Sequence, residues 1–164
     1  MPILDSNTLE FISRGPDQTR RVGSRLGAVL SPGHVICLSG DLGAGKTTLM
    51  QGVAQGWGSL DAVTSPTFVL VNLYRRPDKE QLYHLDAYRL GSSVEAEDLD
   101  LEMMLDIGAL VVEWPERIIN ALPEDHLWVE MNWVAEQKRS LTFVPHGQGY
   151  QEIIDHLKQR AFGG

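Results

Sequence analysis

A glycine-rich segment, Gly40–Thr47 with the sequence GDLGAGKT, constrains the fold of this chain more than any other feature. It directly follows Val35–Ser39, an apolar run without polar alternation, which is typical of a strand buried on both faces. The residues from Lys46 onward are typical of a helix that ends near Gly56. A strand, a glycine loop and a helix in this order form the context in which a phosphate-binding P-loop occurs. We therefore interpret the segment as a nucleotide-binding loop rather than a chance glycine-rich turn.

The chemistry of this loop would come from its backbone and two side chains. Gly40, Gly43 and Gly45 permit tight turns and a close approach to phosphate, and successive N–H groups at a helix start can bind an anion. We expect Lys46 to contact the β- and γ-phosphates and the Thr47 hydroxyl to bind Mg²⁺. The loop therefore predicts binding of Mg-ATP or a closely similar nucleotide. The candidate phosphate-binding residues are Asp41, Leu42, Gly43, Ala44, Gly45, Lys46, Thr47 and Thr48.

A second candidate is Glu113, which ends the fully apolar run Ala109–Val112. A carboxylate at this place in a P-loop protein holds Mg²⁺ directly or through water, and Asp is the usual residue there. The competing interpretation is an ordinary acidic residue at the end of a strand. The loop upstream favours the metal-binding interpretation.

Two further segments keep two interpretations each. Asp86 follows the strand-like run Gln81–Leu85, so it can either orient an attacking water near the γ-phosphate or simply cap the next segment. In Thr64–Phe68, Ser65 or Thr67 can sense the γ-phosphate as part of a switch loop, or the segment can be a proline-containing turn. Spacing alone leaves the first question open and slightly favours the turn for the second.

Other polar and reactive residues receive structural interpretations. His84 alternates with Leu82 and is expected to be a satisfied strand residue. Cys37, the single cysteine, lies in an apolar run and is expected to be a small buried hydrophobe rather than a nucleophile. No set of Cys and His residues has the spacing of a zinc site.

Charge and hydropathy restrict the partners and the compartment. The net charge is −8, and the basic residues gather only in Arg20-Arg21 with Arg25 and in Arg75-Arg76 with Lys79. Unaided, tight nucleic-acid binding is therefore not expected, because it depends on clustered cations. No apolar run approaches the roughly 18–20 residues that span a membrane, and the N-terminus lacks the pattern of a secretory signal. We expect a cytoplasmic protein.

The hydrophobic pattern predicts one α/β domain over residues 1–164. The expected strands are Thr8–Ile12, Val35–Ser39, Phe68–Tyr74, Gln81–Leu85, Ala109–Val112, His126–Trp133 and Ser140–Val144. The expected helices are Pro16–Leu30, the one that begins at Lys46, Val94–Met104 and Gln151–Arg160. Early alternation of strands and helices implies parallel pairing, and the hairpin signals imply antiparallel additions. The fold class is thus a three-layer P-loop NTPase fold with a mixed, largely parallel central sheet.

Four motifs occur in an order that resembles the TsaE (YjeE) family, the small bacterial ATPase of tRNA threonylcarbamoyladenosine biosynthesis. They are Gly40–Thr48, Ser65–Phe68, His84–Leu90 and Glu113–Glu116. The resemblance implies a weak ATPase with partners TsaD and TsaB. These partners attach threonylcarbamoyl to N6 of adenosine 37 in tRNAs that read ANN codons, and ATP hydrolysis is thought to reset the complex between rounds. The partner complex would supply most of the tRNA surface.

The resemblance also implies roles for matching residues. Thr47 and Glu113 would hold Mg²⁺, and Asp86 matches an aspartate that the family requires. Thr67 would belong to a switch-like loop, and Trp114 would lie beside the nucleotide. Together with Lys46 of the loop, Asp86 and Glu113 are the candidate catalytic residues.

The resemblance also bears on one departure from the family pattern and on the segments that would contact adenine. The family often has Phe at the position of Leu85, a departure that changes packing more than chemistry. By position, the segments that contact adenine should include residues near Pro16–Thr19 and near Gln137–Arg139.

Two alternatives stay open beside an ATPase. A small-molecule kinase would share the loop and the Mg²⁺ site, with Asp86 as the base for an acceptor hydroxyl. Such kinases usually carry an arginine-rich lid, whereas the late part of this chain has only Lys138-Arg139. A regulatory GTP switch would read guanine through an Asn-Lys-x-Asp motif, which is absent from the sequence.

Overall fold

The computed structural model describes residues 7–41, 43–63, 71–90, 96–97 and 99–162. Two candidate site residues, Leu42 and Thr67, lie outside the described residues, as does the whole of the expected switch segment Thr64–Phe68.

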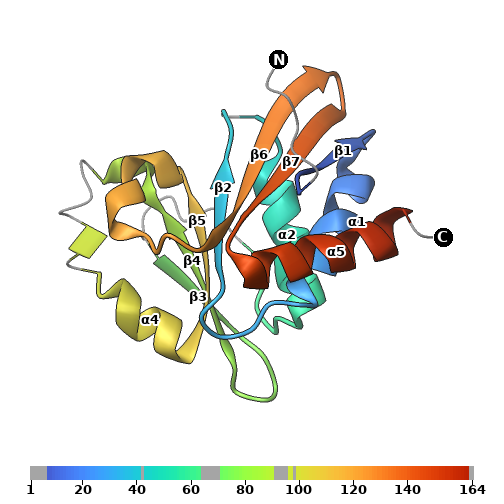
Figure 1. Ribbon diagram of the computed structural model, residues 1–164. Helices are drawn as coiled ribbons and strands as arrows, with labels where there is room; N and C mark the ends of the chain where they lie inside the picture. The colour runs from blue at the N-terminus through green and yellow to red at the C-terminus, as the bar shows by residue number, and fades with distance from the viewer. Residues whose placement is uncertain (1–6, 42, 64–70, 91–95, 98, 163–164) are drawn as a thin grey trace.

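The described residues form a seven-stranded mixed sheet with the order β1-β7-β6-β2-β5-β4-β3 (Figure 1). The four central strands β6, β2, β5 and β4 run parallel to one another, and β1, β7 and β3 are antiparallel additions. This confirms the mixed sheet with a parallel centre. The strands are β1 Leu9–Ser13, β2 Val35–Ser39, β3 Val71–Arg75, β4 Gln81–Asp86, β5 Gly108–Glu113, β6 His126–Ala135 and β7 Lys138–His146.

Helices cover both faces of the sheet, which confirms the three-layer arrangement. One face packs against α1, α2 and α5, and the other packs against α4 and the short 3-10 turns (Figure 1). The helical segments are α1 Pro16–Gly27, α2 Lys46–Trp57, η1 Ala87–Arg89, α4 Leu101–Ile107, η2 Pro115–Arg117, η3 Ile119–Ala121 and α5 Gln148–Phe162. None of these helices is both long enough and apolar enough to cross a lipid bilayer.

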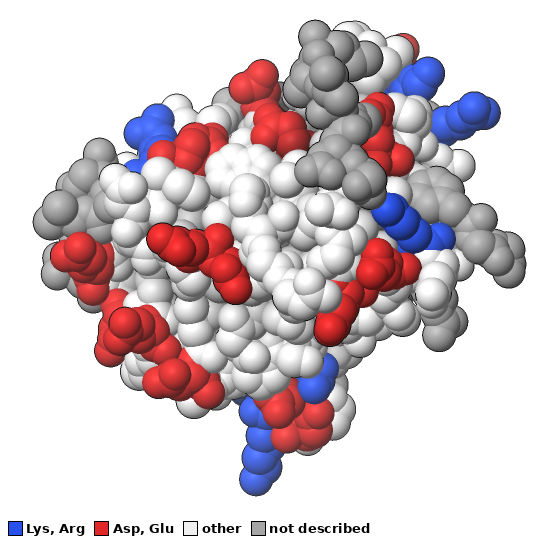
Figure 2. Space-filling model, viewed as in Figure 1, with Lys and Arg blue, Asp and Glu red and all other residues white. Residues whose placement is uncertain are grey.

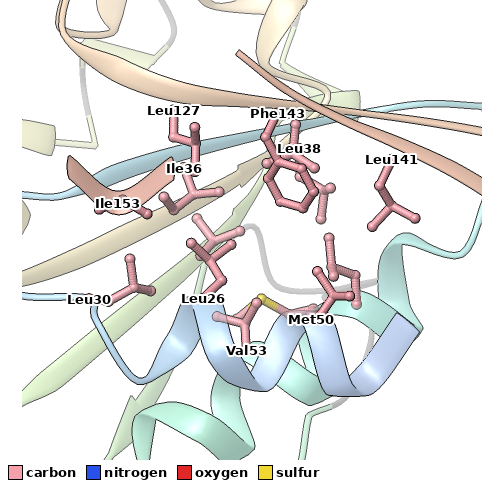
Figure 3. Close-up of a cluster of buried hydrophobic side chains, with 14 of the residues drawn as sticks. Leu26, Leu30, Ile36, Leu38, Met50, Val53, Leu127, Leu141, Phe143 and Ile153 are labelled. Carbon is pink, nitrogen blue, oxygen red and sulfur yellow. The ribbon is translucent and has the colours of Figure 1, made fainter. Parts of the chain in front are cut away.

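The core on the α1–α2 face fixes the strand that leads into the glycine loop. Leu26 of α1 and Met50 of α2 lie below Ile36 and Leu38 of β2, and Phe143 of β7 closes the cluster (Figure 3). On the opposite face, Cys37 of β2 is fully buried, and burial raises its thiol pKa to about 12. Alternate residues of β2 therefore point into the two cores, and the expected structural role of the cysteine is confirmed.

Helices α1 and α2 pack backbone against backbone through glycines. A Cβ added to Gly27 would lie 2.0 Å from the carbonyl oxygen of Val53, and one added to Gly56 would lie 1.9 Å from that of Ser24. No side chain fits at such distances, so the helix pair can approach this closely only with glycine at these positions. The contact holds α1 beside the helix that begins at the glycine loop.

The structure corrects the expected helix Val94–Met104. Asp100 has a left-handed backbone with φ of 54°, and α4 begins only at Leu101. The Asp100 carboxylate accepts a hydrogen bond from the Met103 N–H at 3.3 Å, so it caps the start of a new helix. The acidic composition correctly indicated a helix, but α4 begins later than expected and continues to Ile107. Val94, Glu95 and Asp98 of the expected helix lie outside the described residues.

The two late strands are also longer than expected. β6 continues to Ala135 and β7 begins at Lys138, so only Glu136 and Gln137 form the turn. Gln137 has a positive φ of 64°, which suits a tight hairpin connection. The polar residues between the two expected strands therefore form the end of one long hairpin.

Candidate functional site

The glycine loop lies at the carboxyl end of the central parallel strand. β2 leads into Gly40, and the left-handed Gly45, with φ of 102°, directly precedes the first residue of α2. A Cβ on Gly40 would lie 2.5 Å from the carbonyl oxygen of Met131, so this position excludes side chains. Because glycine has no side chain to cap the helix, the first N–H groups of α2 are available to an anion. The strand–loop–helix arrangement predicted from the sequence is confirmed.

Lys46 is the buried cation of the loop. The residue is only 6% exposed, and its Nζ has no hydrogen-bond partner among the described residues. Nζ lies 3.9 Å from the ring centroid of Trp114. A buried ammonium without hydrogen-bond partners is unfavourable, and a phosphate anion would supply the missing acceptor. The geometry therefore fits an anionic ligand.

Burial lowers the pKa of Lys46, and the surrounding carboxylates oppose that effect. The four carboxylates that raise its pKa are those of Glu113, Glu116, Asp86 and Asp41. One cation thus stands among several anions, and this surplus of negative charge also suits a divalent metal ion held together with a phosphate.

Asp86 and Glu113 occupy equivalent positions in neighbouring parallel strands. They are register partners at the last residues of β4 and β5. The Asp86 Oδ1 atom accepts a hydrogen bond from the Tyr88 N–H at 2.9 Å, so Asp86 caps η1. Both carboxylates lie at the sheet edge from which the glycine loop departs, and the structure brings them together around Lys46.

Among the described residues, no group of three or more His, Cys, Asp or Glu side chains is arranged to hold a metal ion by itself. Magnesium in nucleotide sites is held by one or two protein oxygens together with substrate phosphates and water. Thr47, which is exposed at the start of α2, and the buried Glu113 fit this sparse type of site.

His84 of β4 connects Glu113 to a third strand. Its Nε2 lies 2.5 Å from Glu113 Oε2, and its Nδ1 lies 3.1 Å from the Tyr74 hydroxyl of β3. The expectation of a satisfied strand residue is correct, but its partner is the candidate metal ligand, which the sequence analysis missed. The available signal was the alternation of β4, which places His84 on the same face as Asp86.

Trp114 places an aromatic ring at the mouth of the site. It has a left-handed backbone with φ of 59°, unusual for a bulky residue. Its ring lies 5.1 Å from that of Tyr88, centroid to centroid, and covers the Lys46 ammonium. Arg117 in turn lies 4.8 Å above the Tyr88 ring. The rings restrict access of water to Lys46 from this side.

A cavity of about 480 Å³ lies directly beside the loop. This volume falls within the range of roughly 300–1,000 Å³ typical of small-ligand sites. The Pro16–Thr19 and Gln137–Arg139 segments, expected by position to contact adenine, meet in its wall. The lining residues are Pro16, Thr19, Gly45, Thr48, Trp133, Glu136, Gln137 and Arg139.

The β6–β7 hairpin adds Trp133 to the cavity, a residue that the sequence patterns did not single out. Trp133 is 62% exposed and lines the cavity, so it is not a core residue. Arg139 donates from Nε to the Gly43 carbonyl oxygen at 3.3 Å and thereby ties the hairpin to the loop. Only the long-range approach of the hairpin to α1 reveals the place of Trp133 in the cavity.

The remaining candidates lie on or beside the loop. Asp41 and Gly43 are exposed, Ala44 is buried, and Thr48 is partly exposed and lines the cavity. Gly45 and Thr48 are thus the residues of this stretch that border the cavity.

Comparison with known proteins decides the family. The family model described as "Threonylcarbamoyl adenosine biosynthesis protein TsaE" matches residues 13–141. The chain belongs to the TsaE family. The matched range contains every candidate site residue from Asp41 to Trp114 as well as the hairpin residues Trp133 to Arg139 that line the cavity.

Individual relatives agree with this TsaE assignment. Proteins named tRNA threonylcarbamoyladenosine biosynthesis protein TsaE include one from Bacillus subtilis, 35% identical over 92% of this chain and 94% of its own length. Another, from Streptomyces coelicolor, is 47% identical over 79% of this chain and 91% of its own length. The crystal structure of Bacillus subtilis YdiB matches with a TM-score of 0.78 and 30% identity, covering 94% of this chain and 96% of that chain.

Proposed function

We propose that this TsaE-family protein is a Mg-dependent ATPase required for threonylcarbamoylation of adenosine 37 N6 in tRNAs that read ANN codons. It would act with TsaD and TsaB partners, and ATP hydrolysis would reset their complex between rounds. The pathway rests on family membership and on the names of the relatives. The nucleotide chemistry rests above all on the buried, unpartnered ammonium of Lys46 at the start of α2.

ATP would bind along the loop and the neighbouring cavity. The N–H groups of the loop and Lys46 would hold the β- and γ-phosphates. The cavity beside Gly45 and Thr48 would take the adenosine, with the Trp133 ring in reach as an apolar wall. The proximity of this cavity to the start of α2 supports one nucleotide spanning both features.

Thr47 and Glu113 would hold Mg²⁺, which, when bound, neutralises the charge of the phosphate oxygens. Asp86 would accept a hydrogen bond from the attacking water and orient it toward the γ-phosphorus. Lys46 would stabilise charge that develops on the phosphoryl oxygens. We expect slow hydrolysis by the chain alone and faster hydrolysis when the partners complete the site.

Nucleotide titration and product analysis test the chemistry. By calorimetry, ATP should bind the wild-type chain and bind Lys46→Ala at least about 100-fold more weakly, since a charge-assisted contact is lost. Lys158→Ala, on α5 and outside the family match, is the matched control and should bind normally. Strong preference for GTP, or a phosphorylated metabolite formed much faster than free phosphate, would refute the ATPase proposal.

A further inference from the structure

Three side chains from three adjacent strands form one buried hydrogen-bonded row that ends at the metal-binding carboxylate. Tyr74 of β3, His84 of β4 and Glu113 of β5 are 2%, 0% and 7% exposed. The Tyr74 hydroxyl meets His84 Nδ1 at 3.1 Å, and His84 Nε2 meets Glu113 Oε2 at 2.5 Å. The row therefore uses both nitrogens of the imidazole.

The strand register builds this row. His84 is the register partner of Val111, and Asp86 is the partner of Glu113. His84 and Glu113 are thus diagonal neighbours on one face of a parallel strand pair, a separation that an imidazole ring can span. A slip by one residue would turn the His84 ring to the opposite face. The pairing of β4 with β5 therefore fixes the position of the His84 ring relative to Glu113.

Hydrogen-bond chemistry assigns the proton on Nε2. An ionised carboxylate only accepts hydrogen bonds, so Nε2 must be the donor to Glu113. In the neutral ring Nδ1 is then an acceptor, and the Tyr74 hydroxyl donates to it. Tyr74 therefore selects the tautomer that presents a donor to Glu113, as outer partners do for side chains in metal sites.

We propose that His84 is a positioning residue for the metal-binding carboxylate, with Tyr74 holding the His84 ring in place; this rests on the proposed role of Glu113. Hydrogen bonding to His84 occupies Oε2 and stops rotation of the carboxylate, which leaves Oε1 for the metal ion or its water. A role limited to filling the core would predict no effect of His84 on metal affinity once the protein is folded.

Glutamine and asparagine variants separate these roles. The amide nitrogen of His84→Gln can stand in for Nε2 and donate to Glu113, whereas the shorter His84→Asn reaches only the position of Nδ1. Manganese serves as the probe, because binding removes the EPR signal of free Mn²⁺ and so measures metal affinity without any turnover. The titration uses the full chain saturated with ADP.

The positioning role predicts an order of metal affinity. His84→Asn should weaken Mn²⁺ binding by about 10–100-fold, the usual cost of removing an outer partner, and His84→Gln should recover part of that loss. Tyr74→Phe should weaken binding less. Tyr83→Phe is the matched control, because it removes a hydroxyl bonded to Gln81 from the same strand, and it should bind like the wild type.

Two results would overturn the proposal in distinguishable ways. If Glu113→Gln weakens Mn²⁺ binding but both His84 variants bind normally, positioning by His84 is wrong and the metal role of Glu113 stands. If Glu113→Gln itself binds Mn²⁺ normally, the metal role fails and the proposal fails with it.

A second measurement needs no metal and uses only the wild type and two tyrosine variants. Its outcome therefore does not depend on whether the His84 variants fold. Imidazole ¹⁵N NMR of the metal-free wild-type chain should show the Nε2-protonated tautomer of His84. Tyr74→Phe should shift the tautomer balance and Tyr83→Phe should not. A wild-type ring protonated only on Nδ1, or a Tyr74→Phe protein with unchanged tautomer and Mn²⁺ affinity, would contradict the proposal.

Discussion

At the residue scale, Lys46 combines two properties that seldom occur together, a charge and burial without a hydrogen-bond partner among the described residues. Burial lowers the pKa of its ammonium even though four carboxylates raise it. The sequence motif predicted the position of Lys46, and the structure adds that its ammonium lacks a hydrogen-bond partner within the described residues.

Replacing Lys46 by methionine should therefore stabilise the nucleotide-free protein while preventing ATP binding. Methionine has a similar length and removes the unpartnered buried donor, a change worth about 1–3 kcal/mol in the free energy of unfolding. Urea denaturation without nucleotide measures the gain. A clear loss of stability in Lys46→Met would contradict the description of Lys46 as an unsatisfied cation.

The lowered pKa of Lys46 also predicts a pH dependence. Its folded pKa lies below the unfolded value of 10.5. Between these two values the unfolded chain binds more protons, so the contribution of Lys46 to stability rises with pH in that window. Unfolding curves of the wild type measured across the window, minus those of Lys46→Met, should show this rise. A flat or falling difference would contradict the predicted sign.

Asp86 has a capping role that can be separated from its proposed role toward water. Asp86→Asn keeps an oxygen acceptor for the Tyr88 N–H but removes the charge. It should therefore unfold within about 0.5 kcal/mol of the wild type, as substitutions that keep such features do. ATP hydrolysis with the partner proteins should fall severely. Normal hydrolysis by Asp86→Asn would show that its charge is dispensable.

At the element scale, the approach of α1 to α2 places the nucleotide cavity. Thr19 of α1 and Thr48 of α2 both line that cavity. The helix pair meets through glycines, and the spacing of four residues between Gly52 and Gly56 was visible in the sequence. The sequence did not show that α1 packs against these glycines, because periodicity identifies the buried face of a helix but not the element that covers it.

Gly56→Ala should destabilise the fold, because its Cβ would meet the Ser24 carbonyl oxygen at 1.9 Å. Overpacking of this kind costs about 1–3 kcal/mol. Gly149→Ala on α5 is the control, since nothing lies within 4 Å of its added Cβ. Thermal unfolding of the two variants makes the comparison. Equal stability of Gly56→Ala and the wild type would contradict the close helix contact.

The strand order determines those contacts of the site that local sequence patterns did not predict. The apolar runs predicted β2 and β5, and the loop motif and its helix followed from local signals. The contact between His84 and Glu113 depends on β4 pairing with β5, which tertiary packing decides. The same holds for the cavity, whose wall joins a hairpin to a distant helix. Local chemistry was thus predictable, whereas its long-range support was not.

At the scale of the whole molecule, the net negative charge bears on how this chain and its proposed partners would share the binding of tRNA. The net charge is −8, and acidic side chains outnumber basic ones on the face that Figure 2 shows. Since RNA affinity depends mainly on clustered cations, this chain is better suited to act beside an RNA-binding complex than to hold tRNA alone. The proposed roles of TsaD and TsaB agree with that distribution.

Reconstitution of tRNA modification over many turnovers tests the proposed function most directly. The reaction contains the TsaD and TsaB partners, tRNA, threonine, bicarbonate and ATP, and modified adenosine is counted per partner complex. Wild-type chain should raise this number well above one, and Lys46→Ala should not, although Lys158→Ala should match the wild type. Modification that proceeds equally with the wild type, with Lys46→Ala and without this chain would contradict the proposed function.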